Sequence, residues 1–315
     1  HNMSTYFNTG TAAWTPPDVP DTIPHGDMPG DKISISDVHK QKANVIFPKL
    51  MELLPPILTQ NPHRRAVIAV CGGSGVGKSE TASLLAYYFR QAGMGSYTLS
   101  GDNYPRRIPV YNDAERLRIF RQGGMRGLVQ NGLYTMQRGD IVRAYQRGER
   151  DADPSLAIEQ PWMAAYQREG RTALAGYLGS TAEINFDELS DIIAQFKNGA
   201  DTLYLKRMGR EETALWYEAV DCRATGILLI EWTHANSDHL HGVDVPVLLN
   251  STPSETLAHR KARHRDGGTD SPFTTMVLEL EQQMLEKQAS KAKLIVSKSA
   301  QLLSFCAYRR TMAEE

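Results

Sequence analysis

One segment constrains the fold more than any other: residues 72–79 read Gly-Gly-Ser-Gly-Val-Gly-Lys-Ser. This matches the pattern G-x-x-x-x-G-K-[ST], whose glycines let backbone N–H groups approach phosphate oxygens without side-chain clashes. An apolar run of strand length (66–71) precedes the segment, and residues 80–92 place their apolar side chains on one helical face. A strand, this loop and a helix in succession predict a phosphate-binding site, because the helix N-terminus adds partial positive charge.

The parts of this loop have distinct expected roles. Lys78 is expected to reach the β- and γ-phosphates of a nucleoside triphosphate, and the Ser79 hydroxyl to bind Mg²⁺. ATP and Mg²⁺ are therefore the expected cofactors. The alternative is a glycine-rich turn that matches by accident, and the flanking strand and helix weigh against it. The residues predicted to contact the nucleotide are Gly72, Gly73, Ser74, Gly75, Val76, Gly77, Lys78, Ser79 and Glu80.

The overall composition excludes several kinds of partner. The 315 residues carry 35 basic and 36 acidic side chains, a formal net charge of −1, so the basic surface typical of nucleic-acid or membrane binding is missing. No apolar run approaches the roughly 20 residues that cross a bilayer. Three cysteines without C-x-x-C spacing favour a reducing, cytoplasmic location. We therefore expect neither a nucleic-acid nor a membrane partner.

The order of apolar runs predicts the fold class. Strand-like runs alternate with helical segments, which predicts an α/β fold of P-loop NTPase type, a mostly parallel sheet with helices on both faces. A ligand should lie at the carboxyl ends of these strands. An Arg-rich stretch without strand signals predicts an inserted helical subdomain that covers the acceptor site, with most of its arginines on a solvated face. The predicted divisions are an extended or disordered N-terminal arm (1–35), the first part of the nucleotide-binding domain (36–111), the insertion (112–183) and the second part (184–315).

Local signals place the individual elements. Ser36 is expected to cap a helix that kinks at Pro48 and ends at Pro55-Pro56, outside the nucleotide-binding sheet. Further helices are expected over 185–197, 255–265 and 271–289. The expected strands are 66–71, 96–100, 202–205, 224–230, 245–250 and 293–296.

Acidic residues follow two of the expected strands. Asp102 comes just after the strand 96–100, and Glu231 ends the apolar run 224–230. Phosphoryl transfer needs a phosphate cradle, a metal ion, a carboxylate that orients the acceptor, and cations that offset developing charge. Asp102 is therefore the candidate base and Glu231 the candidate Mg²⁺ ligand. The alternatives are a turn carboxylate at Asp102 and a surface carboxylate at Glu231.

The basic helix expected over 255–265 suggests a lid. Arg263 and Arg265 would close over the phosphates and bring positive charge to the transferred group, with a solvated helix face as the alternative. Three histidines between 234 and 241 lie close together in the sequence. Their irregular spacing, with no cysteine nearby, favours a loop with incidental histidines over a metal site.

These motifs occur in the order seen in the uridine kinase and phosphoribulokinase family, which the chain resembles over about residues 64–110 and 184–300. The resemblance implies that the Asp after the second strand is the base, that the strand-end Glu serves the metal, and that an Arg-Asp segment lies in the lid. It also matches Arg210 to an arginine of a substrate hairpin. The segments that carry it are Gly72–Ser79, Asp102 with Tyr104, Asn185-Phe186-Asp187, Glu231 and Arg263-His264-Arg265-Asp266.

The chain also departs from that family. Tyr204 is followed by Leu205 and Lys206 where uridine kinases carry Tyr-Asp-Phe, and residues 267–269 read Gly-Gly-Thr instead of Arg-Gly-Arg. Uridine is therefore not the expected acceptor. A second resemblance competes, because residues 101–103 (Gly-Asp-Asn) are similar to a segment of adenylylsulfate kinases that an arginine soon follows.

Together the residues and the resemblance predict an ATP- and Mg²⁺-dependent kinase that transfers the γ-phosphoryl group to a hydroxyl of a small nucleoside-, sugar- or polyol-like metabolite. Adenylylsulfate kinase is the alternative acceptor assignment, and a regulatory P-loop NTPase or switch is the alternative of another class. A carboxylate rather than a mobile Thr or Ser loop after the second strand favours the kinase. The small-molecule acceptor is the expected partner, a homodimer remains open, and the residues expected to line the acceptor site are Asp102, Tyr104, Arg106, Arg107 and Arg210.

Overall fold

The computed structural model describes residues 14–27, 33–211, 215–265 and 270–314, without the side chains of 263–265. The chain divides into two compact units. The predicted insertion, 112–183, falls inside unit 2, which begins earlier and takes up a second segment of chain. Unit 1 comprises His1–Tyr104, Asn185–Thr256 and Leu285–Glu315, and unit 2 comprises Pro105–Ile184 and Leu257–Met284.

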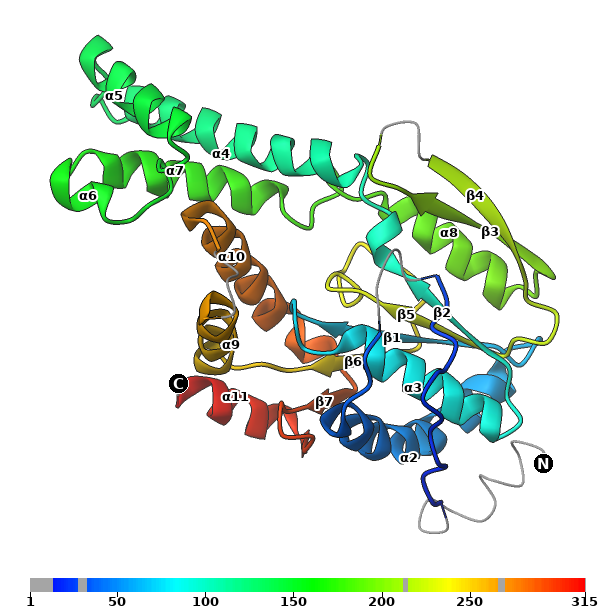
Figure 1. Cartoon of the computed structure of the whole chain (residues 1–315). Coiled ribbons are helices and arrows are strands. Elements are labelled where there is room, and N and C mark those ends of the chain that lie inside the picture. Colours follow the sequence, from blue (N-terminus) through cyan, green and yellow to red (C-terminus); the bar gives the residue numbers. More distant parts are fainter. Residues whose placement is uncertain (1–13, 28–32, 212–214, 266–269, 315) are drawn as a thin grey trace. The chain divides into compact units, whose positions relative to one another are not determined.

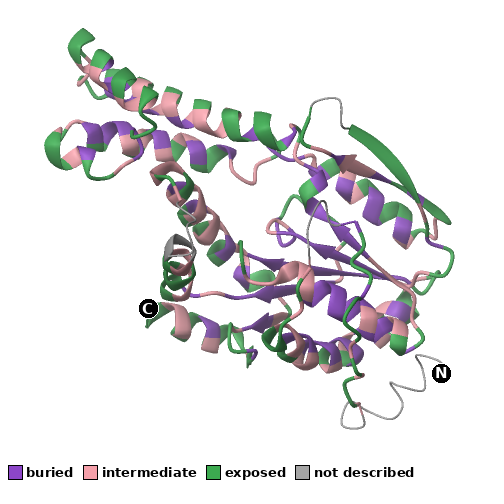
Figure 2. Cartoon of the chain, viewed as in Figure 1, coloured by how far each residue is buried: buried purple, intermediate pink, exposed green. Residues whose placement is uncertain are grey.

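Unit 1 is built on a six-stranded sheet with the order β2-β5-β1-β6-β7-β8 (Figure 1). The first five strands in this order run parallel, and β8 is antiparallel to β7. Figure 2 shows the central strands as buried, which agrees with their nearly continuous apolar sequences. The strands are β1 (Ala66–Gly72), β2 (Ser96–Ser100), β5 (Ile227–Glu231), β6 (Val245–Leu249), β7 (Leu294–Val296) and β8 (Leu302–Leu303).

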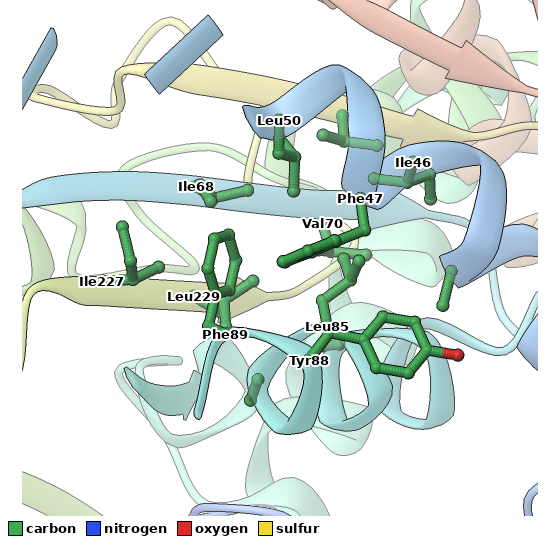
Figure 3. Packing of buried hydrophobic residues seen from close by; sticks show 14 of the residues in the cluster. Ile46, Phe47, Leu50, Ile68, Val70, Leu85, Tyr88, Phe89, Ile227 and Leu229 are labelled. Atoms are coloured by element: carbon green, nitrogen blue, oxygen red, sulfur yellow. The ribbon is translucent and has the colours of Figure 1, made fainter. Parts of the chain in front are cut away.

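Helices cover both faces of this sheet. Helices α2 (Asp37–Gln60) and α3 (Lys78–Gln91) pack together and against alternate side chains of β1 and β5, with Phe47 and Phe89 in contact between them (Figure 3). Helix α8 (Phe186–Lys197) also contacts β1, and none of its buried side chains belongs to that cluster, so it covers the other face. The predicted mostly parallel α/β sheet with helices on both faces is confirmed.

Helix α2 differs from its prediction. It passes through Pro48, Pro55 and Pro56 and ends at Gln60, so the predicted end at Pro55-Pro56 is wrong. Each proline removes one backbone hydrogen bond, but the helix buries a long apolar stripe against α3 and the sheet. In proteins such packing, more than local propensity, decides whether a helix continues. The predicted cap at Ser36 is confirmed.

A two-stranded antiparallel hairpin follows α8. Strand β3 (Thr202–Met208) extends the predicted strand 202–205, and it pairs with β4 (Leu215–Asp221), which was not predicted. Every residue of β4 is exposed or half-buried, as Figure 2 shows, so its sequence carries no alternation of apolar and polar positions. The strand is instead defined by its hydrogen-bonded pairing with β3, which the local sequence pattern does not reveal.

The N-terminal arm is ordered where the structure describes it. Residues 14–27 have no regular secondary structure but pack on unit 1. Trp14 lies against Phe47 and Tyr88, with ring centroids 5.0 and 5.5 Å away, and Ile23 joins the core. The arm is therefore extended over these residues, and the disordered alternative does not apply to them.

Unit 2 is helical, in agreement with the absence of strand signals. Helices α4 and α7 pack closely because Gly124 and Gly170 leave room for the rings of Tyr166 and Phe120. The helices of this unit are α4 (Pro109–Gln130), α5 (Met136–Arg147), α6 (Leu156–Glu159), α7 (Met163–Tyr177), and most of α9 (Pro253–Arg265) and α10 (Pro272–Gln288). Unit 1 also contains the 3₁₀ turns η2 (Gly101–Asn103) and η3 (Ala289–Lys291) and the helix α11 (Phe305–Ala313).

Two arginines of unit 2 are structural. Arg121 pairs with the buried carboxylate of Asp151 at 3.1 Å, and Arg116 pairs with that of Glu183 at 2.6 Å. A buried carboxylate needs such a partner, since removing the partner leaves a desolvated charge. These two arginines are exceptions to the solvated face, which was predicted for most of the arginines in this stretch.

Among the residues that the structure describes, Cys71, Cys222 and Cys306 form no disulfide bond. Among the described helices, none combines the length and the apolar character that crossing a bilayer requires.

Candidate functional site

The strand register brings three predicted site segments to one edge of the sheet. Strand β5 lies between β1 and β2, and Glu231 at its end is level with Val70 of β1 and Ser100 of β2. All three strands run parallel, so their carboxyl ends meet there. The phosphate loop follows β1, and Asp102 follows β2. Residues separated by more than 100 positions in the sequence therefore share the edge where parallel α/β folds bind ligands.

The phosphate loop has the backbone that its glycines predict. Gly75 and Gly77 adopt φ values of +82° and +84°, a region that favours glycine. Gly77 precedes the first residue of α3, and its carbonyl accepts a hydrogen bond from Thr81 N–H at 2.9 Å. Lys78 Nζ donates to the carbonyl of Gly73 at 2.8 Å, across the loop. The lysine ammonium thus lies against a glycine-rich loop at a helix N-terminus, an arrangement that suits phosphate.

Helix α2 supports this loop from outside, which sequence reasoning missed. Lys42 is 4% exposed, and its Nζ donates to the carbonyl of Val76 at 3.1 Å. Burial lowers the pKa of Lys42, and nearby Lys298 lowers it further, while Glu255 and Glu80 oppose the change. Polar residues on the face of α2 toward the loop were a sequence signal for this contact, but solvated helix faces show the same pattern.

His39 lies one helical turn before Lys42 and packs against the loop backbone. A Cβ placed on Gly77 would come within 2.7 Å of the His39 ring. His39 Nδ1 accepts a hydrogen bond from Ser36 N–H at 3.0 Å, which fixes the ring at the start of α2. Burial lowers the pKa of His39, opposed by the charge of Glu80. Gly77 therefore meets two demands at once, a positive φ and contact with a ring.

Asp102 lies in the 3₁₀ turn η2 and is exposed. Its backbone N–H donates to Ser100 Oγ at 3.3 Å, so the last side chain of β2 fixes the start of the turn. The next residue, Asn103, is fully buried, and its Oδ1 accepts from Met208 N–H of β3 at 3.2 Å. The turn thus keeps Asp102 exposed between two fixed neighbours, Ser100 and Asn103. A base that takes a proton from an acceptor must be exposed in this way.

Glu231 is only 3% exposed, so it is not the surface carboxylate of the alternative interpretation. The next residue, Trp232, packs directly over Gly101: a Cβ there would lie 2.0 Å from the indole. Gly101 therefore lets the end of β5 and the turn carrying Asp102 approach each other. Tyr104 is fully buried, and burial raises the pKa of its hydroxyl. Because it has no exposed surface, Tyr104 supports the turn in this structure and does not form an open wall of the site.

Other predicted residues lie elsewhere. Arg210 is exposed beyond β3 in unit 1. Arg106 and Arg107 belong to unit 2, where Arg106 Nε donates to the Thr181 carbonyl at 2.7 Å and Arg107 to Tyr177 Oη at 3.0 Å. Their predicted role at the acceptor stays a prediction.

The remaining predictions concern the lid and the histidine loop. The side chains of Arg263 and Arg265 lie outside the described residues, as do all of 266–269, so the lid also stays a prediction. The residues that the structure describes contain no cluster of three or more His, Cys, Asp or Glu that would hold a metal ion by itself.

The site residues nevertheless fit a nucleotide-bound Mg²⁺. Such an ion takes most of its ligands from phosphates and water and needs only one or two from protein. Ser79 lies in the first turn of α3, next to Lys78, and Glu231 supplies a carboxylate at the same edge of the sheet. These are oxygen donors, which Mg²⁺ prefers.

Comparison with known proteins adds to this geometry. The chain matches no protein-family profile. It is 39% identical over 238 residues to a bifunctional alpha-galactosidase/sucrose kinase of Mediterraneibacter gnavus. The match covers 76% of this chain but only 20% of that relative, so the chain spans about a fifth of its length.

The solved structures that match this chain have low sequence identity to it. A putative fructose transport system kinase from a Silicibacter species is 13% identical with a TM-score of 0.45, covering 81% of this chain and 95% of that one. A possible uridine kinase from Bacillus stearothermophilus is 14% identical with a TM-score of 0.40, covering 80% and 98%. A D-glycerate 3-kinase from Cryptococcus neoformans is 11% identical with a TM-score of 0.42, covering 85% and 98%.

Proposed function

We propose that the chain is an ATP- and Mg²⁺-dependent kinase that phosphorylates a hydroxyl of a sugar-like small molecule. One observation carries the proposal: the phosphate loop, the buried Glu231 and the exposed Asp102 share one edge of the sheet because β1, β5 and β2 are adjacent and parallel. A phosphate cradle, an oxygen ligand for metal and an outward-facing carboxylate are the parts that phosphoryl transfer to a hydroxyl requires.

The donor half of the site would hold the triphosphate in the loop. Backbone N–H groups of residues 73–79 would bind phosphate oxygens, and Lys78 would exchange its bond to the Gly73 carbonyl for the β- and γ-phosphates. Ser79 and Glu231 would hold Mg²⁺. That ion, when bound, neutralises charge on the phosphates and on the transferred group.

The acceptor half would be organised by Asp102. A carboxylate there can accept the proton from an acceptor hydroxyl as the oxygen attacks the γ-phosphorus, and it can orient that hydroxyl in line. Its exposure suits this role, since a base must reach a substrate. A switch that activates water has no need of a carboxylate that faces an acceptor, which disfavours the regulatory NTPase.

The relative suggests the acceptor class. A protein 39% identical to this chain carries the name sucrose kinase, and the matching part covers 76% of the chain. We therefore place a sugar ahead of nucleosides and polyols, with sucrose as the first acceptor to test. Adenylylsulfate remains the second candidate because of the Gly-Asp-Asn sequence at 101–103.

The test is phosphate transfer from labelled ATP with Mg²⁺ to a panel of sugars, nucleosides, polyols and adenylylsulfate. We expect a labelled sugar phosphate from the wild type. Asp102→Asn should lose transfer by on the order of a hundredfold or more while ATP binding stays nearly intact. High ATP turnover that no acceptor raises would favour the regulatory NTPase, and transfer to adenylylsulfate alone would favour the second candidate. Full activity of Asp102→Asn would refute the role of the base.

A further inference from the structure

Asp27, in the N-terminal arm, is a buried carboxylate beside the site edge. Its side chain has 0% exposed area. Oδ1 accepts a hydrogen bond from Ser100 N–H at 2.5 Å, and Oδ2 accepts one from Arg207 NH1 of β3 at 2.8 Å. Arg207 in turn donates to Tyr97 Oη of β2 at 3.1 Å. One carboxylate thus connects the arm, the end of β2 and the hairpin, all within unit 1.

The arm reaches this position by close backbone contact with β2, the edge strand of the sheet. Gly26 has φ +68°, and a Cβ there would lie 2.1 Å from the Thr98 carbonyl oxygen. That carbonyl accepts a hydrogen bond from Asp27 N–H at 3.2 Å. The approach needs glycine, so the arm is fitted to the strand by its backbone as well as by the Asp27 side chain.

From Asp27 a short chain of hydrogen bonds leads to Asp102. The carboxylate binds Ser100 N–H, and Ser100 Oγ accepts from Asp102 N–H at 3.3 Å. Ser100 is fully buried, so water does not replace either bond while the fold is intact. A hydrogen bond to an ionised carboxylate is about twice as strong as a neutral one.

Ion pairing with Arg207 explains why the carboxylate can stay charged without water. Burial raises the pKa of Asp27 to about 6, against the effect of Arg207 and the backbone N–H groups, so the carboxylate is ionised at neutral pH. A simple anchor for the arm could be an apolar side chain, which carries no desolvation cost. A buried charge aimed at the backbone of Ser100 points instead to the placement of the turn that follows.

We infer that Asp27 is a positioning residue for the reaction: through Ser100 it fixes the turn that presents Asp102 to the acceptor. The effect on catalysis rests on the proposed function, whereas the contacts themselves are those of the arm with β2 and hold whatever the reaction is. It assigns the arm a role in catalysis without contact to substrate. Placement errors of about 1 Å in a reacting group can cost on the order of a hundredfold in rate.

The test compares steady-state kinetics of Asp27→Ala and Ser100→Ala with those of Asp21→Ala. Asp21 is an exposed acid on the same arm, so its variant controls for charge and for mutation of the arm. We expect Asp27→Ala to lower kcat by about tenfold or more while KM for ATP changes less than about twofold, because the phosphate loop is untouched. Asp21→Ala should match the wild type.

The double variant tests whether the two residues act through one path. If Asp27 acts through Ser100, Asp27→Ala/Ser100→Ala should have a kcat within about twofold of Asp27→Ala alone, whereas independent effects would multiply. The inference is overturned if folded Asp27→Ala keeps the wild-type kcat, or if the effects multiply. Should Asp27→Ala fail to fold, Ser100→Ala decides, with a kcat loss of about threefold or more expected and an unchanged kcat overturning the inference.

Hydrogen exchange separates this inference from the proposed function. If the wild type transfers no phosphate to any acceptor, the proposed function fails, and amide exchange over residues 98–104 still reads the contacts. Faster exchange there in Asp27→Ala than in Asp21→Ala would support positioning of the turn by Asp27. Equal exchange in the two variants would overturn it.

Discussion

The raised pKa of Asp27 predicts that ionisation of this carboxyl opposes folding. Burial raises the pKa from 3.8 to about 6, although Arg207 and the Ser100 N–H act in the opposite direction. A higher pKa in the folded state means that folding binds a proton more tightly, so stability falls as pH rises between roughly 4 and 6. A shift of about 2 pKa units corresponds to about 3 kcal/mol over the whole titration, of which about 1.4 kcal/mol lies between pH 5 and 7.5.

The groups that interact with the Asp27–Arg207 pair do not titrate in this interval. Arg207 stays cationic, and burial raises the pKa of both Tyr97 and Tyr104, so these hydroxyls stay neutral. A hydrogen bond from Trp216 lowers the pKa of Glu218, which also pairs with Arg207. A pH effect that depends on the residue at position 27 therefore reports the Asp27 carboxyl.

The assay is denaturant unfolding of the wild type and Asp27→Asn at pH 5 and pH 7.5, both with Trp162→Phe. That substitution removes the tryptophan of unit 2 and leaves those of unit 1 as fluorescent probes. Asparagine keeps an oxygen for Ser100 N–H but does not titrate. We expect the free energy of unfolding of the Asp27 protein to fall by about 1.4 kcal/mol relative to Asp27→Asn between the two pH values. A difference that stays constant, or that grows in favour of Asp27 as pH rises, would refute the reasoning.

Two further predictions concern the support of the phosphate loop. Gly77→Ala forces a positive φ on alanine and a clash with the His39 ring, so it should destabilise the protein by about 1–3 kcal/mol and abolish ATP binding. The control is Gly176→Ala, which has free space at its Cβ and should be neutral or stabilising. Thermal unfolding measures the stability of both variants, and calorimetry measures their ATP binding. Lys42→Met leaves the Val76 carbonyl without its donor and should raise the Kd for ATP by about tenfold with little change in kcat; an unchanged Kd would show that Lys42 does not order the loop.

Local patterns predicted the strand, loop and helix of the phosphate loop well. The phosphate loop is one continuous segment, and its flanking strand and helix are short-range signals, so the sequence sufficed to place Lys78 and Ser79 at the start of α3. The strands that end before Asp102 and at Glu231 were also visible as apolar runs. Their adjacency was not predicted, because β5 lies between β1 and β2, whereas strands consecutive in the sequence are usually neighbours in a sheet.

Contacts between distant segments were not predictable in the same way. Asp27 meets Arg207 across 180 positions, and Lys42 meets Val76 across 34, and neither pair belongs to a periodic pattern. Strand β4 has a sequence without alternation, and its residues are exposed or half-buried on both faces. The prolines of α2 gave a strong stop signal that tertiary packing overrode.

The segment before β1 supports both halves of the proposed site. Lys42 and His39 contact the loop that would hold the phosphates, and Asp27 contacts the strand end that fixes Asp102. The motif glycines allow the loop its shape but do not enforce it, because glycine is also the residue with the most alternative conformations. A buried ammonium on one loop carbonyl and a ring against Gly77 restrict those alternatives before nucleotide binds, which lowers the ordering cost of binding. The loop and the contacts from α2 and the arm therefore have different roles. The loop supplies the interactions with phosphate, and the contacts reduce the loss of conformational entropy that those interactions must overcome.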